Sequence, residues 1–189
     1  MNRKVATIIS RIFDPFLMFV VLLFFALQKS TLAGPTMIKF LFLSFTLMIG
    51  VPVVLLLYAI KKKIVSNWDI SERKERPKVF GIILVIEFAF LFLLRPIMDP
   101  FLFHTFLSIF IAMVGFAGVT LFWKISGHAF INSLVSGFIV LWFGWGFWPV
   151  LLAVPLVSWS RVVRRDHTVL QVVAGALYAW MLLILMGRF

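Results

Sequence analysis

Long apolar stretches alternate with short polar joints along the whole chain. A helix needs about 20 mainly apolar residues to cross the hydrocarbon core of a bilayer. The pattern predicts seven membrane helices, at about residues 12–32, 40–60, 79–94, 101–123, 126–143, 144–159 and 168–186. The predicted fold is therefore all-α, a polytopic bundle of transmembrane helices with seven spans, or six if one short stretch is re-entrant.

Composition excludes the other fold classes. Hydrophobic residues make up 63% of the 189 residues and charged residues only 13%, against roughly 45–50% apolar residues in soluble domains. So few charges cannot cover a water-exposed surface, and a disordered chain needs low hydrophobicity. We expect a single integral membrane domain, residues 1–189, with two N-terminal spans in 1–60 and a motif-bearing core in 61–189.

The basic N-terminus followed by an apolar run also resembles a signal peptide, with Leu32-Ala-Gly34 as a weak cleavage site. We expect an uncleaved first span instead, because every later stretch is equally apolar.

The net charge of +11 is distributed unevenly. Alternating the spans places 14 of the 18 Lys and Arg residues on one face, and leaves Lys29, Lys39, Arg95 and Arg188 on the other. By the positive-inside rule the first face is cytoplasmic, in what we expect to be a prokaryotic cell membrane. We therefore expect the excess positive charge to face the membrane and its lipids, and we expect no nucleic-acid partner. The sequence does not predict the oligomeric state.

Three polar clusters fall on the basic face, and the first is Asp69–Pro77. Asp69, Arg73 and Arg76 are spaced i, i+4 and i+7, which predicts one helical face. Guanidinium groups on such a face bind anions through paired N–H donors. The simpler alternative, favoured for this cluster alone, is a solvated basic loop beside the membrane.

The second cluster is Lys124-Ile-Ser-Gly-His128. Ser126 suits the N-cap of the following helix, and Gly127 lets the backbone approach a ligand closely. Backbone amides at a helix N-terminus bind anions, and His128 beside them is placed to transfer a proton. The alternative is an ordinary capped helix with a histidine at the membrane interface.

The third cluster runs from Ser160-Arg161 to His167 and Gln171. His167 and Gln171 are four residues apart, so they share a helix face. Alternatively, Thr168 and Gln171 fit a capping box, with Asp166 as another possible cap, and His167 is a histidine at the membrane interface.

Together these clusters indicate phosphoryl transfer. This chemistry needs one histidine as nucleophile, a second histidine as general acid, and a cradle of arginines and backbone amides that binds the phosphate. The chain has no cysteine and no cluster of His and carboxylate residues at ligand spacing. We therefore expect neither a metal nor another cofactor.

Arg76-Pro77, Ser126-Gly127-His128 and Ser160-Arg161-x5-His167 resemble the three signature motifs of the type 2 phosphatidic acid phosphatase superfamily, in the same order. The resemblance implies a metal-independent phosphatase. His167 matches the nucleophile that forms a phosphohistidine, and His128 matches the acid that protonates the leaving alcohol. The residues that match the phosphate cradle are Arg76, Arg161, Ser126 and Gly127.

Two positions depart from the family pattern. Asp69 occupies the place of the first motif's lysine, and Lys74 and Arg73 are the candidates to replace that lysine in space. Asp69 and Lys124 are further accessory candidates at the site. Gln171 occupies the place of the aspartate that orients the nucleophile. A glutamine oxygen accepts the same hydrogen bond without the charge. We therefore expect a weaker or differently tuned nucleophile, unless the charge comes from Asp166, Asp69 or Glu87.

The sequence thus predicts an integral membrane hydrolase of phospholipid metabolism. Its substrate would be a lipid or polyprenyl phosphate or diphosphate, held with its tail in the bilayer. Two alternatives stay open: a non-catalytic binder or transporter of anionic lipids with a degenerate site, and a lipid phosphotransferase.

Overall fold

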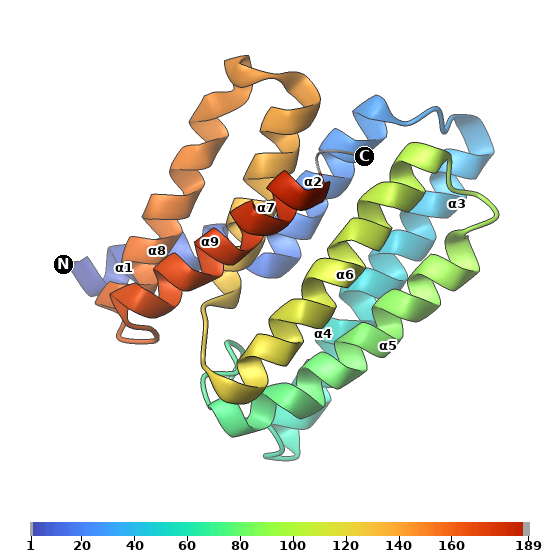
Figure 1. Ribbon diagram of the computed structural model, residues 1–189. Helices are drawn as coiled ribbons and strands as arrows, with labels where there is room; N and C mark the ends of the chain where they lie inside the picture. The colour runs from blue at the N-terminus through green and yellow to red at the C-terminus, as the bar shows by residue number, and fades with distance from the viewer. Residues whose placement is uncertain (1, 187–189) are drawn as a thin grey trace. The chain divides into compact units, whose positions relative to one another are not determined.

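The computed structural model describes residues 2–186, and within them every regular element is a helix (Figure 1). Arg188, counted above among the cations, lies outside the described residues. The α-helices are α1 (Asn2–Ile12), α2 (Pro15–Lys29), α3 (Gly34–Phe45), α4 (Val51–Lys61), α5 (Arg76–Leu94), α6 (Pro100–Phe122), α7 (Gly127–Phe143), α8 (Ala153–Val163) and α9 (Val169–Met186). The π-helix η1 (Thr46–Gly50) joins α3 to α4, and the 3-10 helices η2 (Arg73–Glu75) and η3 (Trp145–Leu152) precede α5 and α8.

The all-α polytopic fold predicted from the apolar pattern is confirmed. Among the described residues, five helices are long and apolar enough to cross a membrane, or six if the bent pair α1–α2 forms one span. α7, the fifth predicted stretch, is apolar but has only 17 residues.

The chain forms two compact units. One comprises the residues up to Phe25 and those from Ile125 onward, and the other is Ala26–Lys124. These bounds differ from the division at residue 60 used for the sequence, and the single integral membrane domain stays a prediction.

In the first unit α7 is the central helix. It packs against α8, α9 and η3, while α1 packs against α8. Twelve residues of α7 are buried, and at Gly137 an added Cβ would meet the side chain of Leu183 on α9. Small residues permit such close approach of membrane helices. The side chain of Asn132 donates to the carbonyls of His128 and Phe13, so α7 is also tied to the end of α1.

In the second unit α5 packs against α3, η1, α4 and α6. The rings of Phe40, Phe90 and Phe106 meet between these helices, with centroids 4.9–6.3 Å apart. Such contacts add to the packing of apolar surface. Glu87 of α5 is buried, and its Oε2 has no hydrogen-bond partner in the described part of the chain.

The polar turn before α6 is held by one carboxylate. Asp99 Oδ2 accepts hydrogen bonds from Ser30 Oγ (2.7 Å) and from the backbone N–H (2.6 Å) and hydroxyl (3.1 Å) of Thr31. Its Oδ1 accepts from the N–H of Leu102 (2.8 Å) and so caps α6. Burial by itself, the largest single effect, raises the pKa of Asp99, but the hydrogen bonds together outweigh it and lower the pKa below its ordinary 3.8.

We predict that Asp99→Ala lowers the free energy of unfolding by about 1–2 kcal/mol near neutral pH, the usual cost of a lost N-cap. Because the folded-state pKa is lowered, this stabilisation is fully present above 3.8 and is lost as the pH falls through the lower folded value. Thermal unfolding in detergent at several pH values measures it. Asp99→Asn, which still caps, should lose less, and an Asp99→Ala deficit that persists in strong acid would contradict the assignment.

Candidate active site

The third motif is shaped by the end of α8. Arg165 adopts a left-handed conformation (φ 65°). Its N–H donates to the carbonyl of Val162 (2.9 Å), and the N–H of Asp166 donates to the carbonyl of Arg161 (3.0 Å). This pair of bonds is the Schellman motif that ends many helices. The N–H of His167 also donates to the carbonyl of Arg161 (3.3 Å), so the turn accounts for the five residues that separate Arg161 from His167.

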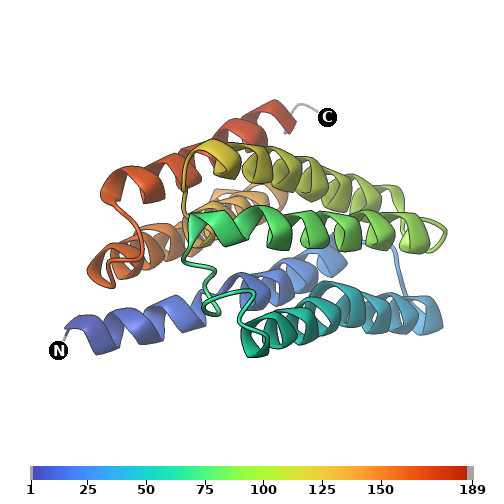
Figure 2. The ribbon, with the colours of Figure 1, turned by 90° about the horizontal axis from the view of Figure 1, so that it is seen from below.

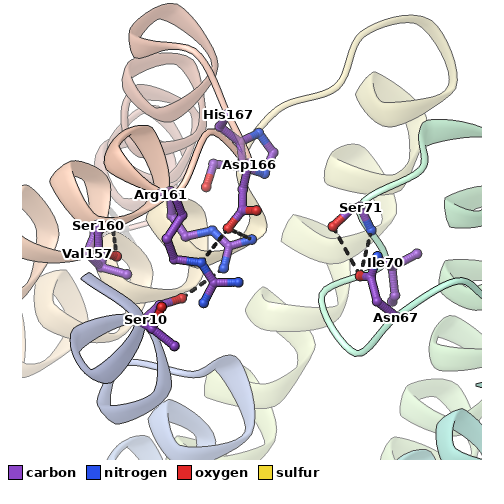
Figure 3. Close-up of polar contacts among 12 residues, drawn as sticks. Ser10, Asn67, Ile70, Ser71, Val157, Ser160, Arg161, Asp166 and His167 are labelled. Atoms are coloured by element: carbon purple, nitrogen blue, oxygen red, sulfur yellow. Dashed lines mark hydrogen bonds and ion pairs between the residues drawn. The ribbon is translucent and has the colours of Figure 1, made fainter. Parts of the chain in front are cut away.

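The side chain of Arg161 is buried, with 1% of its surface exposed. Its NH1 donates to Ser10 Oγ of α1 (2.8 Å), and its NH2 lies 3.2 Å from Asp166 Oδ2 (Figure 3). The same carboxylate oxygen lies 2.8 Å from Arg164 Nε. A buried guanidinium is tolerated only when it is paired and hydrogen-bonded. Asp166, expected from the sequence as a possible helix cap, thus forms ion pairs with two arginines.

His167 is buried and faces Gln171. Its Nδ1 lies 3.0 Å from Gln171 Oε1. That oxygen also accepts from the N–H of Thr168 (3.2 Å), while Thr168 Oγ1 accepts from the N–H of Gln171 (3.3 Å). These two reciprocal bonds are the capping box predicted from the sequence. The capping box and the histidine contact use the same glutamine oxygen.

This arrangement favours one tautomer of His167. The atom of Gln171 that accepts from the N–H of Thr168 must be the amide oxygen, since an NH2 group cannot accept that bond. An imidazole nitrogen beside an acceptor oxygen carries the proton, so Nδ1 is protonated and Nε2 keeps its lone pair. The contact with Gln171 therefore leaves Nε2 as the nitrogen that carries the lone pair in the neutral ring, and the role of His167 as a nucleophile stays a prediction.

The second motif lies beside the start of α9. Ser126 caps α7, with its Oγ accepting from the N–H of Ala129 (3.3 Å), as the sequence predicted. Its own N–H donates to the carbonyl of Gln171 (3.1 Å). Gly127 and the buried His128 follow in the first turn of α7. The second and third motifs are therefore joined directly through the backbones of Ser126 and Gln171.

Gly175, one turn beyond Gln171, permits this contact. A Cβ on Gly175 would lie 2.6 Å from the carbonyl oxygen of Ser126 and 3.4 Å from its N and C atoms. These are backbone atoms, which cannot rotate away as a side chain would. Sequence reasoning did not single out Gly175, although a small residue in a membrane helix is a sign of close helix contact. Ser10 was also missed, and the sequence carries no sign of its bond to Arg161.

The first motif belongs to the second unit and departs from the prediction. Asp69, Arg73 and Arg76 do not form one helical face, because residues 62–72 are turns and bends and α5 begins only at Arg76. Pro77 suits the first turn of α5, as proline does in helices generally. Ile70, with a φ of 47°, is incompatible with a helix through this segment.

Local hydrogen bonds shape this loop instead. Asn67 Oδ1 accepts from the N–H (3.2 Å) and the hydroxyl (3.0 Å) of Ser71 (Figure 3). Glu75 accepts from the N–H and hydroxyl of Ser66 at 3.0–3.1 Å. Asp69 lies within this loop and is partly buried.

The cations of the first motif have different environments. Arg76 is buried, and its Nε donates to the carbonyl of Ile70 (3.0 Å). Arg73 NH1 donates to the carbonyls of Leu121 (2.7 Å) and Phe122 (3.0 Å) at the end of α6, a favourable position for a cation at a helix C-terminus. Lys74 is exposed and Lys124 partly buried. The roles assigned to these residues at the phosphate site stay predictions.

Comparison with known proteins gives one partial match. A stretch of 56 residues is 43% identical to a protein named lipid A 4'-phosphatase from Helicobacter pylori strain J99. The match covers 29% of this chain and 28% of that protein, so it spans little more than a quarter of the relative. No family model and no solved structure matches the chain.

We predict that Gly175→Ala forces the start of α7 away from α9. The added Cβ meets immovable backbone, and overpacking of this kind costs about 1–3 kcal/mol. Thermal unfolding of the purified protein in detergent measures the loss. Gly118→Ala in α6 is the matched control, because a Cβ there meets nothing within 4 Å and the helix gains about 0.5–1 kcal/mol. Equal stability of the two variants would contradict the close contact.

Proposed function

We propose that the protein is an integral membrane phosphatase that hydrolyses a lipid or polyprenyl phosphate or diphosphate through a phosphohistidine on His167. The observation that carries the proposal is the contact between His167 Nδ1 and a glutamine oxygen whose identity is set by the capping box. The partial identity to a lipid A 4'-phosphatase supports the same class of substrate.

In the proposed reaction, His167 Nε2 attacks the phosphorus and the bond from phosphorus to the lipid oxygen breaks. His128 donates a proton to that oxygen, so the lipid leaves as an alcohol or as a protonated monophosphate. Water then attacks the phosphohistidine, His128 takes a proton from the water, and inorganic phosphate departs as His167 is restored. Both histidines return to their starting states.

Arg161 and the start of α7 are the proposed phosphate-binding groups of the first unit. Charge accumulates on the three equatorial oxygens during phosphoryl transfer, and N–H donors placed in advance stabilise it. Gly127 has no side chain of its own to cover the first backbone amides of α7, and Ser126 caps this turn by accepting from the N–H of Ala129. Asp166 offsets part of the charge of Arg161 without removing its remaining N–H donors.

The apolar helices suit a substrate whose tail stays in the bilayer. Basic residues at a membrane surface attract anionic lipids by about 1 kcal/mol each. The alternative of a lipid binder or transporter with little chemistry is favoured by the neutral Gln171 and by Asp69 in place of the motif lysine. An assay of phosphate release separates the two.

We predict phosphate release by the purified protein in EDTA, and loss of that release in His167→Ala to the background level. The panel is phosphatidate, phosphatidylglycerophosphate, undecaprenyl diphosphate and lipid A. Removal of the nucleophile leaves no covalent route, so the expected loss is at least a thousandfold, on the order seen for catalytic triads. Activity that survives His167→Ala, or that EDTA abolishes, would overturn the mechanism, and substrate binding without turnover would favour the binder.

We predict further that Gln171→Glu accelerates formation of the phosphohistidine. Glutamate has the same length and also fits a capping box, while hydrogen bonds to charged groups are stronger by about 1 kcal/mol, roughly fivefold in rate. Single-turnover kinetics with Gln171→Leu as the matched control tests this. The leucine variant loses the acceptor and should be slowed at least about a hundredfold through the wrong tautomer. An unchanged rate in both variants would remove Gln171 from the mechanism.

A further inference from the structure

Helix α1 presents three distinct sides. Successive residues of a helix turn by about 100°, which groups Ala6 with Ser10, Lys4 with Arg11, and Val5 with Ile8 and Ile12. Ala6 and Ser10 are buried, and the cations are exposed. Val5, Ile8 and Ile12 are also exposed, by 45%, 59% and 54%. An exposed apolar stripe beside an exposed basic stripe is the pattern of a helix that lies in the membrane surface.

The sequence separates α1 from the span that follows. α1 and α2 meet at an angle of 42°. Figure 2 shows the two as consecutive blue helices at the N-terminal end of the chain. Asp14 Oδ1 accepts from the N–H of Phe16 (3.0 Å), and Pro15 is the first residue of α2. A cap followed by proline is a strong start signal for a new helix. α1 and α2 are therefore two separate helices, and α1 does not continue the direction of α2.

The charge of α1 excludes it from the hydrocarbon core. Arg3, Lys4 and Arg11 are three cations among eleven residues, and the helix has no acidic residue. Each cation costs about 2.5–3.5 kcal/mol at the centre of a bilayer. Arg11 lies 3.8 Å from Asp14 Oδ2. At the membrane surface, Arg3 and Lys4 attract anionic headgroups while the apolar stripe of α1 enters the acyl region.

Arg3, Lys4, Thr7 and Ile8 lie next to one another on the exposed surface of α1. Two cations next to an apolar wall match the phosphate and the first acyl carbons of an anionic phospholipid. On its buried side, α1 contributes Ser10 Oγ as the acceptor of Arg161 NH1 (2.8 Å). One short helix thus connects an exposed basic surface to the buried arginine of the candidate site.

We propose that α1 is an interfacial helix that binds the headgroup of an anionic phospholipid through Arg3 and Lys4, and that Ser10 couples its docking to the position of Arg161. The docking stands independently of the enzyme's chemistry. The coupling rests on the proposed phosphatase function, in which Arg161 binds phosphate and Ser10 is a positioning residue.

The absence of cysteine from the chain allows a unique label. Ile8→Cys, carrying an environment-sensitive fluorophore, is placed in the full chain in nanodiscs of phosphatidylcholine alone or mixed with phosphatidylglycerol. We expect blue-shifted emission and quenching by spin-labelled lipid in the anionic discs, both reduced by salt because surface charge is screened. Inorganic phosphate added to the neutral discs should not reproduce the shift.

The matched variants are two double substitutions on the same background. Arg3→Gln with Lys4→Gln should weaken docking by roughly 30-fold, at about 1 kcal/mol for each cation. Lys62→Gln with Lys63→Gln removes two exposed cations elsewhere and should leave the emission unchanged. Emission that is the same in both lipids, or that responds equally to the two double variants, overturns the docking.

The coupling is tested by phosphate release in the same discs. We expect anionic lipid to raise the turnover of the wild type, and Ser10→Ala to abolish that increase while the fluorophore still reports a docked helix. An increase that survives Ser10→Ala overturns the coupling but not the docking. If the wild type releases no phosphate in either lipid, the proposed function and the coupling fail together, whereas the emission still decides the docking.

Discussion

The candidate site depends on the burial of one positive charge. Arg161 is enclosed in an apolar helical unit, and an unpaired guanidinium there would cost several kcal/mol. Asp166 supplies the opposite charge and Ser10 supplies a hydroxyl acceptor. Because Asp166 follows Arg161 by one Schellman turn, their pairing also fixes the backbone that leads into His167. The position of the candidate nucleophile is thus a consequence of neutralising one buried cation.

Helix ends supply the remaining polar groups. The interior of a membrane helix has its backbone N–H and C=O groups bonded to each other, and only the first and last turns have groups available for other partners. The Ser126 cap, the Thr168–Gln171 box and the turn after α8 all lie at such ends. The close approach at Gly175 brings two of these ends together. The polar groups of the candidate site are thereby confined to a few turns, and the rest of each helix can be apolar.

Features that depend only on residues close together in the sequence were predictable from it. The helices follow from apolar runs, and the caps at Ser126 and Thr168 follow from residue type and spacing within one turn. The prediction that Asp69, Arg73 and Arg76 share one helical face was wrong, because this spacing defines a face only where the chain is helical. Asn67 and Glu75 bind the loop backbone and compete with helix formation there.

Features that join distant parts of the chain were not predictable from spacing. Ser10 and Arg161 are 151 residues apart, and Gly175 is significant only because Ser126 packs against it. The two ion pairs of Asp166 depend on how the turn after α8 folds back. In each case tertiary packing determines which residue is the partner, and a single sequence does not show how the helices pack.

In the proposed reaction His167 acts first as a nucleophile and then as a leaving group, and these two roles make opposite demands on Gln171. A carboxylate would stabilise the developing positive charge on the imidazole and so favour attack on phosphorus. The same stabilisation would make the phosphohistidine persist, because the positive charge that the carboxylate stabilises is lost when the imidazole leaves the phosphorus. A neutral amide oxygen orients the ring and selects the tautomer without favouring either step by charge. With Asp166 paired to Arg161 and Arg164, the orientation of His167 is therefore supplied by hydrogen bonding, and the local negative charge is used to hold the arginines.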